Sequence, residues 1–175
     1  MVASKAQQLV SGPGTYVLGN PNGDVTIVEF FDYNCPYCKA IEPRVQALLK
    51  ADPRVKLVVK EFPILTPQSL VASKAAMASA RQGKYAAFHQ ALMLNKGNLT
   101  EAQIFETAKR VGLDVARLRR DMVSPAVMEA VYVNLNLARS LRLFQVPTVI
   151  VDNHVLTGPS AEFDFPRAVA AARAN

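Results

Sequence analysis

Two long apolar segments on either side of a helical stretch constrain the fold of this chain most strongly. Residues 25–31 (VTIVEFF) and 55–60 (VKLVVK) are almost continuously hydrophobic, which is typical of strands buried on both faces of a sheet. Between them, residues 39–51 repeat apolar side chains at helical spacing. A strand, a helix and a second strand in this order form a βαβ unit, so we expect the two strands to be parallel.

The pattern changes after this unit, because residues 67–141 are rich in Ala and carry repeated helix start signals. Thr100 begins a capping box, Asp114 is a second helix cap, and Ser124 stands directly before Pro125. The spacing predicts five helices, over residues 68–82, 84–95, 101–111, 115–122 and 125–141. A hairpin and a last helix then complete the chain, over residues 148–151, 154–157 and 161–173.

These elements predict an α/β fold that is interrupted by helices. With 175 residues, half of them hydrophobic, the chain is large enough to bury a core without disulfide staples. We expect a flexible segment over residues 1–14, a β-containing domain built from residues 15–66 and 142–175, and an inserted all-helical domain over residues 67–141. The sequence has no apolar run of about 18 residues, so we expect no membrane insertion.

The net charge of +6 is concentrated in the inserted segment, which holds ten of the 20 basic residues but only five of the 14 acidic residues. The basic residues alternate with Val and Leu at helical spacing and are not interleaved with aromatics, so we expect no nucleic-acid binding. A solvated helix face is the favoured interpretation, and an anionic partner is the alternative. Residues 1–5 lack the apolar core of a signal peptide, which indicates either a cytosolic protein or a chain whose leader was removed.

The two cysteines, Cys35 and Cys38, carry the chemistry that we expect of this chain. They flank Pro36 and Tyr37 and stand between the first apolar strand and the helix that follows it. The first turn of a helix has free backbone N–H groups and partial positive charge, which stabilise a thiolate. We therefore expect Cys35 to be a nucleophile with a depressed pKa, and Cys38, one turn further, to be the resolving thiol.

The two thiols have three alternative uses: a zinc site, an inert disulfide and a Cu(I) site. A zinc site needs four ligands, and only His89 and His154 are available to complete one, at a spacing that fits no zinc finger. An inert disulfide between such close neighbours stabilises a fold little. A chaperone or metal-binding module that holds Cu(I) between the two thiolates stays open, because two soft ligands suffice for that ion.

A second candidate element is the tripeptide Val146-Pro147-Thr148, directly before the predicted hairpin. A Pro at the start of a strand, after a long helical excursion, is a candidate for a cis peptide bond, with an ordinary trans Pro as the alternative. A cis bond bends the chain toward Cys35 and leaves the backbone of Val146 available to pair with an extended substrate peptide.

Taken together, these residues resemble the DsbA family of thioredoxin-fold thiol–disulfide oxidoreductases, and most closely its branch of ScsC-like and Com1-like proteins. The motifs that carry the resemblance are residues 23–39, 60–65 and 146–148, and the likeness extends over residues 15–175. It implies a thioredoxin fold with a helical insertion, no cofactor besides the redox-active disulfide, and a bacterial periplasmic location. It also implies Cys35 as the nucleophile, Cys38 as the resolving cysteine and Pro147 as the cis-Pro.

Glu29 is a third candidate, because it lies inside an apolar strand where the family often has a buried acid. A desolvated carboxyl group has a raised pKa and is suited to accept or relay the proton of Cys38. Lys60, at the end of the neighbouring strand, is a candidate partner, and the alternative is that Glu29 is simply a paired buried charge. For substrate contacts we expect Pro36, Tyr37, Val146 and Thr148, which neighbour the cysteines and the cis-Pro.

The expected activity is thiol–disulfide exchange with cysteine-containing protein substrates, in support of oxidative folding, with a membrane-bound or soluble redox partner that recycles the disulfide. Whether the protein is an oxidase, an isomerase or a reductase stays open. A glutaredoxin-like reductase is the rival enzyme, since CPYC occurs there, but it predicts a shorter chain and a Gly-Gly pair where only Gly158 is present. Tyr37 replaces the His of the most familiar family member, so we expect a less extreme redox potential. The short segment before residue 15 predicts a monomer.

Overall fold

The computed structural model describes residues 2–157 and 164–174, and its centre is a five-stranded mixed sheet. The strands are β1 (Tyr16–Gly19), β2 (Val25–Phe31), β3 (Val55–Glu61), β4 (Thr148–Val151) and β5 (His154–Thr157). Their order across the sheet is β1-β3-β2-β4-β5. The central pair β2 and β3 is parallel, as the βαβ pattern predicted, and the other pairs are antiparallel.

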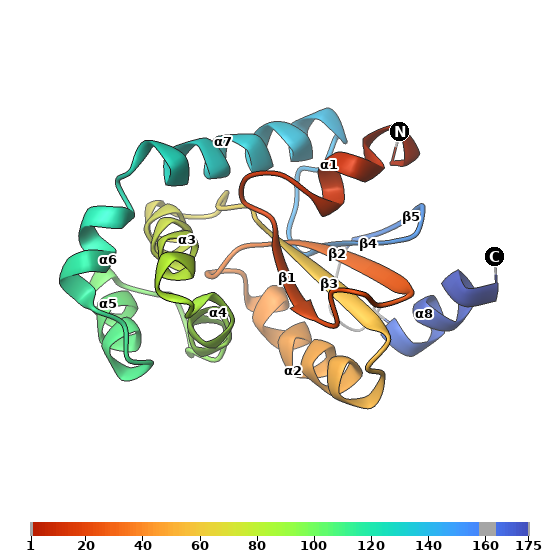
Figure 1. Ribbon diagram of the computed structural model, residues 1–175, viewed down its shortest axis with the longest axis horizontal. Coiled ribbons are helices and arrows are strands. Elements are labelled where there is room, and N and C mark those ends of the chain that lie inside the picture. Colours follow the sequence, from red (N-terminus) through yellow and green to blue (C-terminus); the bar gives the residue numbers. More distant parts are fainter. Residues whose placement is uncertain (1, 158–163, 175) are drawn as a thin grey trace.

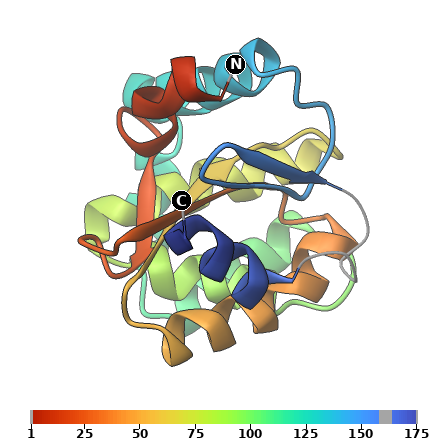
Figure 2. The ribbon, with the colours of Figure 1, turned by 90° about the vertical axis from the view of Figure 1, so that its right-hand side faces the viewer.

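Helices cover both faces of the sheet and extend beyond one side of it (Figures 1 and 2). The N-terminal helix α1 (Ala6–Val10) and α7 (Pro125–Ser140) lie on one face, and α2 (Pro36–Ala51) and α8 (Phe165–Ala174) lie on the other. The remaining helices are α3 (Pro67–Ser79) with the 3-10 turn Ala80–Gln82, α4 (Tyr85–Met93), α5 (Glu101–Arg110) and α6 (Val115–Asp121). No helix in the described ranges is long and apolar enough to cross a membrane.

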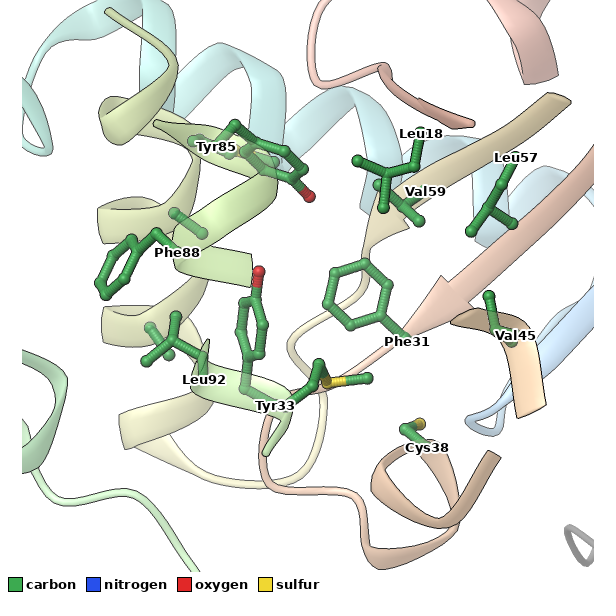
Figure 3. Packing of buried hydrophobic residues seen from close by; sticks show 14 of the residues in the cluster. Leu18, Phe31, Tyr33, Cys38, Val45, Leu57, Val59, Tyr85, Phe88 and Leu92 are labelled. Carbon is green, nitrogen blue, oxygen red and sulfur yellow. The ribbon is translucent and has the colours of Figure 1, made fainter. Parts of the chain in front are cut away.

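The large hydrophobic core runs without interruption from the sheet into the helices between β3 and β4. It contains Phe31 from β2, Val45 from α2 and Leu57 from β3, together with Phe88 and Leu92 from α4. Figure 3 shows these side chains meeting in one cluster. A smaller core lies on the opposite face of the sheet, under α1 and α7. Burial on both faces explains why β2 and β3 are apolar along nearly their whole length.

The predicted fold class and all five inserted helices are confirmed, with ends within a few residues of the expected positions. Thr100 and Asp114 cap their helices as predicted. Ser124 occupies the position before α7, but its hydroxyl forms no capping hydrogen bond there. The last helix begins at Phe165, and the predicted start at residue 161 lies outside the described residues. The division into domains stays a prediction.

The N-terminal segment, expected to be flexible over residues 1–14, contains helical residues. Ala3–Lys5 form a 3-10 turn that leads into α1, so residues 3–10 are helical. Leu9 is buried and belongs to the smaller core with Phe30 and Val58, and the Lys60 side chain donates to the Gln8 carbonyl oxygen. The polar composition of this segment did not indicate a helix, because a short helix is held against a sheet by only a few tertiary contacts.

Candidate active site

The two cysteines lie at the junction between β2 and α2. Cys35 is the N-cap residue, with extended backbone, and Pro36 follows at the first helical position, where its missing N–H costs no hydrogen bond. The Cys35 Sγ accepts a hydrogen bond from the Cys38 backbone N–H at 3.2 Å, so the sulfur replaces the usual capping oxygen. Both cysteines are free thiols and are buried. The position at a helix start therefore agrees with the sequence prediction.

The two sulfurs differ strongly in acidity. The pKa of Cys35 is lowered, mainly because the Cys38 thiol donates to its sulfur, and further because the backbone N–H groups of Cys38 and Tyr37 point at it. The pKa of Cys38 is raised well above its usual range, mainly by burial and then by the neighbouring Cys35. Near neutral pH this arrangement favours a thiolate on Cys35 and a protonated thiol on Cys38.

The Val146–Pro147 loop lies directly against the first cysteine. The peptide bond between these two residues is cis, and the Val146 carbonyl oxygen lies 3.5 Å from the Cys35 Sγ. Val146 is half-buried, whereas Pro36 and Tyr37 are exposed on the rim of the site. Thr148 is fully buried, and its hydroxyl donates to the Gln145 carbonyl oxygen, so this side chain fixes the loop and does not face outward.

Three polar side chains attach residues 32–39, the cysteine loop, to their surroundings. Asp32 accepts hydrogen bonds from the backbone N–H groups of Asn34, Ile64 and Leu65. The Asn34 amide bonds to the Thr66 hydroxyl and accepts the N–H of Leu99, and Lys39 donates to the Asn95 and Gly97 carbonyl oxygens. The cysteine loop is therefore held both by the end of β3 and by the segment between α4 and α5.

Glu29 is buried on the face of β2 that α2 covers, and its Oε1 has no hydrogen-bond partner among the described residues. Its pKa is raised from 4.5 to about 8, mainly by burial and then by the negative charges of Glu42 and Cys35. Glu29 in turn raises the pKa of Cys38. The carboxyl group is thus electrostatically coupled to both cysteines.

Lys60 is not the partner of Glu29, and this part of the sequence interpretation is wrong. In the parallel register Lys60 pairs with Phe30, whereas Glu29 pairs with Val59. Because neighbouring residues of a strand face opposite sides, the Lys60 side chain lies on the other face of the sheet from Glu29. There it donates to the Gln8 carbonyl oxygen and to the Thr15 hydroxyl, and so holds the N-terminal segment.

The structure adds a buried polar cluster that the sequence did not reveal. Glu61 accepts hydrogen bonds from the hydroxyls of Tyr33, Tyr85 and Ser73 at 3.0, 2.9 and 2.7 Å. Burial raises its pKa to about 8, and the three donors offset part of this effect. His89 lies in the core, and the other histidine, His154, is exposed.

Some of these residues left a signal in the sequence. Glu42 stands four residues after Cys38, so both lie on one face of α2. Glu61 is an acid that directly follows an apolar strand, which is the kind of position that calls for hydrogen-bond partners. The partners themselves come from α3, α4 and the cysteine loop, and no local pattern pairs them. Among the residues that the structure describes, no three His, Cys, Asp or Glu side chains form a metal-binding cluster.

A dithiol at the start of a helix, beside a cis-Pro loop and above a mixed sheet with a helical insertion, defines a thioredoxin-fold redox protein. The model of the DSBA-like thioredoxin domain family matches residues 26–170, and the chain therefore belongs to this family. Among curated relatives, it is 30% identical over 146 residues to the Na(+)/H(+) antiporter NhaA 3 of Salinispora tropica. That match covers 82% of this chain but only 22% of the antiporter, so the chain spans about a fifth of that relative.

Solved structures extend the likeness to nearly the whole chain. A thioredoxin-like oxidoreductase from Silicibacter pomeroyi DSS-3 is 43% identical, with a TM-score of 0.89 and coverage of 96% of this chain and 97% of the other. The catalytic domain of Proteus mirabilis ScsC is 24% identical, with a TM-score of 0.87 and coverage of 99% and 97%, and it shows the shared fold. The chain is thus a member of the DSBA-like thioredoxin domain family, and it shares its fold with a thioredoxin-like oxidoreductase and with ScsC.

Proposed function

We propose that this protein oxidises or rearranges cysteines of protein substrates by exchanging the Cys35–Cys38 disulfide with them. The observation that carries the proposal is the asymmetry of the two thiols. Cys35 has a lowered pKa at the start of α2, and Cys38 is a buried thiol with a raised pKa behind it. A stabilised Cys35 thiolate is a good leaving group, which favours the transfer of the disulfide to a substrate.

In the oxidising direction, a substrate thiolate attacks the Cys35 Sγ of the disulfide form. The Cys35–Cys38 bond breaks, a mixed disulfide forms, and Cys38 leaves as a thiolate that takes up a proton. A second substrate thiolate then attacks the substrate sulfur of the mixed disulfide, and Cys35 leaves as the stabilised thiolate. The substrate loses two electrons and the enzyme dithiol gains them, so no further cofactor or metal takes part.

In the reverse direction, Cys38 resolves the mixed disulfide by attacking Cys35, and for this it must lose its proton. Glu29 is the proposed acceptor of that proton. The support is its position under α2, its unpaired Oε1, and a pKa of about 8, which suits proton exchange near neutral pH.

The surface around the cysteines suits extended and partly unfolded substrates. Tyr37 is 52% exposed, Phe144 is 74% exposed, and Ile64 and Leu65 are also exposed large apolar side chains. Phe144 stands two residues before Val146, whose backbone lies beside Cys35. We propose that this rim receives apolar side chains of a substrate while Val146 contacts its backbone, as in β-strand addition.

In the oxidising direction the dithiol must be reoxidised after each turnover, and an oxidising compartment favours this step. We propose a bacterial periplasmic location for the protein and a separate redox partner that recycles the disulfide. We further propose that the protein works as a monomer. Membrane anchorage and the antiporter activity of the longer relatives form no part of this proposal.

Trapping of mixed disulfides tests the assignment of the two cysteines. In Cys38→Ser the resolving thiol is absent, so covalent complexes between Cys35 and substrate proteins should accumulate on non-reducing gels. Cys35→Ser is the matched control and should trap far less, because Cys38 is fully buried. Equal turnover of both variants and the wild type in a dithiol–disulfide assay would refute the proposed function.

The redox potential of the Cys35–Cys38 pair decides the direction. It is measured by equilibration with glutathione and by mass-tagging of free thiols, because the chain has no Trp to report the change by fluorescence. A potential well above the glutathione couple supports an oxidase. A potential well below it assigns the protein to reduction and overturns the oxidative direction.

A further inference from the structure

A line of buried polar groups connects the far side of the core with the neighbourhood of Cys38. Glu61, at the end of β3, bonds to the Tyr33 hydroxyl at 3.0 Å, and the same hydroxyl lies 3.0 Å from His89 Nδ1. On the other side of the ring, His89 Nε2 lies 3.9 Å from the Glu42 Oε2. In Figure 3 the hydroxyls of Tyr33 and Tyr85 point into the same part of the core. The line thus runs Glu61, Tyr33, His89, Glu42.

The hydrogens available to this line restrict how it can be arranged. The Tyr33 hydroxyl has one hydrogen, which goes either to Glu61 or to His89 Nδ1. If Glu61 is ionised, Tyr33 donates to it, His89 Nδ1 carries a hydrogen and donates to Tyr33, and the bare Nε2 faces Glu42. If Glu61 is protonated and donates to Tyr33, the Tyr33 hydrogen goes to Nδ1, and the hydrogen of His89 is on Nε2 and faces Glu42.

The two arrangements act oppositely on Glu42. An Nε2–H dipole 3.9 Å from Glu42 stabilises the carboxylate, whereas a bare Nε2 disfavours it and favours the protonated acid. The 3.9 Å separation is longer than a hydrogen bond, so this last link is electrostatic. His89 is fully buried and its pKa is lowered to about 3 by burial, so the ring stays neutral and changes only its tautomer.

We propose that Glu61, Tyr33 and His89 form a buried switch in which the protonation of Glu61 sets the tautomer of His89, and this tautomer sets the charge of Glu42. When Glu61 is protonated, His89 carries its hydrogen on Nε2, and Glu42 is a carboxylate. When Glu61 ionises, its hydrogen passes to the Tyr33 oxygen, the Tyr33 hydrogen passes to Nδ1, and the Nε2 hydrogen leaves the ring, to Glu42 or to water. No bond other than O–H and N–H bonds is made or broken.

The groups that face this line come from every element packed against it. They are Ser73 of α3, Tyr85 of α4, Asp32 beside Tyr33, Tyr16 of β1, Gln46 of α2 and Glu29 of β2. Tyr85 also stacks on His89, and Phe31 contacts its ring edge-on. Two cations act on the outer groups, Arg81 on Tyr16 and Lys39 on Asp32. Four carboxyl groups lie along or beside the line, those of Glu61, Glu42, Glu29 and Asp32.

The consequence for the reaction rests on the proposed function. A negative charge on Glu42 is one of the causes of the raised pKa of Glu29, which is the proposed proton acceptor for Cys38. His89 and Tyr33 are therefore positioning residues: they act through Glu42 on Glu29 and do not touch the reacting sulfurs. The switch links the interior of the inserted helices to the basicity of the active-site carboxyl group.

The test is nitrogen-15 NMR of the histidine rings in the reduced protein, titrated from the acidic to the alkaline side of pH 8, the pKa of Glu61. Only two histidines are present, and the exposed His154 is an internal reference. We expect His89 to change from the Nε2–H to the Nδ1–H tautomer through this range. A His89 tautomer that is the same on both sides would overturn the proposal.

Two tyrosine variants separate the switch from a merely structural hydroxyl. Tyr33→Phe and Tyr85→Phe each remove one hydroxyl donor to the same Glu61 oxygen, but only Tyr33 connects Glu61 to His89. The pH-dependent tautomer change should vanish in Tyr33→Phe and persist in Tyr85→Phe. Its persistence in Tyr33→Phe refutes the switch. If Tyr33→Phe does not fold, Glu61→Gln replaces it, and we expect that variant to hold Nε2–H at every pH.

The readout is independent of catalysis, so the switch and the proposed function fail separately. A tautomer change in a protein without thiol–disulfide turnover supports the switch and overturns the function. Turnover without a tautomer change supports the proposed function and overturns the switch. With both present, Tyr33→Phe should move the pH midpoint of mixed-disulfide resolution to higher pH, because Nε2–H then stays toward Glu42 and its carboxylate keeps the pKa of Glu29 raised. Tyr85→Phe should leave the midpoint near that of the wild type.

Discussion

Replacing Glu29 by Gln removes a buried charge whose cost depends on pH. In the unfolded chain this carboxyl group ionises near pH 4.5, whereas in the folded protein its pKa is about 8. Between these values the unfolded chain releases the proton and the folded chain keeps it. The folded state binds more protons there, so its stability falls as the pH rises.

The size of the effect follows from the two pKa values. Each pH unit in this window lowers the free energy of unfolding by about 1.4 kcal/mol. From pH 4.5 to pH 8 the total is about 5 kcal/mol, and at pH 7 it is about 3 kcal/mol. Glu29→Gln carries no such charge, so its stability relative to the wild type should increase steadily over this window and level off above it.

The assay is urea unfolding of the reduced protein at a series of pH values, with the difference in free energy of unfolding plotted against pH. Glu106→Gln, at an exposed position of α5, is the matched control and should give a curve parallel to that of the wild type. A flat difference curve for Glu29→Gln would refute the reasoning. It would mean that water or another group solvates the carboxylate in the folded protein.

Further variants test other parts of the structure. Because the pKa of His89 is lowered from 6.5 to about 3, wild-type stability should fall by about 1.4 kcal/mol per unit as the pH drops through that window, and acid unfolding of His89→Phe should lack this slope. Thr66→Ala removes the capping box of α3 and a hydrogen bond to Asn34, and thermal unfolding should show a loss of about 1 kcal/mol. Phe144→Ala should leave stability unchanged, because the side chain is 74% exposed. It should lower the rate with protein substrates by about tenfold, or about 1.4 kcal/mol, but not the rate with glutathione disulfide.

Local patterns in the sequence predicted most of the fold and the reactive pair. Helix caps such as Thr100 and Asp114 act within one turn of the chain, so they can be recognised without a structure. Cys35, which caps α2, can likewise be recognised from its local sequence. Local patterns also predicted the inserted helices and the proline loop, and the family resemblance added the roles of Cys35, Cys38 and Pro147.

The buried polar cluster around Glu61 could not be predicted from the sequence, because its members are distant from one another along the chain. Glu61 meets Tyr33, Ser73 and Tyr85 from three different elements, and nothing near Glu61 indicates which hydroxyls will arrive. The Lys60 interpretation failed on a different point. It joined two charged residues of neighbouring strands without their register, and a shift of one residue reverses the face of the sheet on which a side chain lies.

The hydrogen bonds of Asn34 and Lys39 also bear on how such enzymes can be rebuilt. Because these side chains tie the cysteine loop and α2 to the backbone at Leu99, Asn95 and Gly97, the catalytic unit does not end where the sheet ends. A minimal version made by deleting the helices would leave the residues on both sides of the cysteines without their anchors. A graft of CPYC into another scaffold would need to bring the segment between α4 and α5 with it.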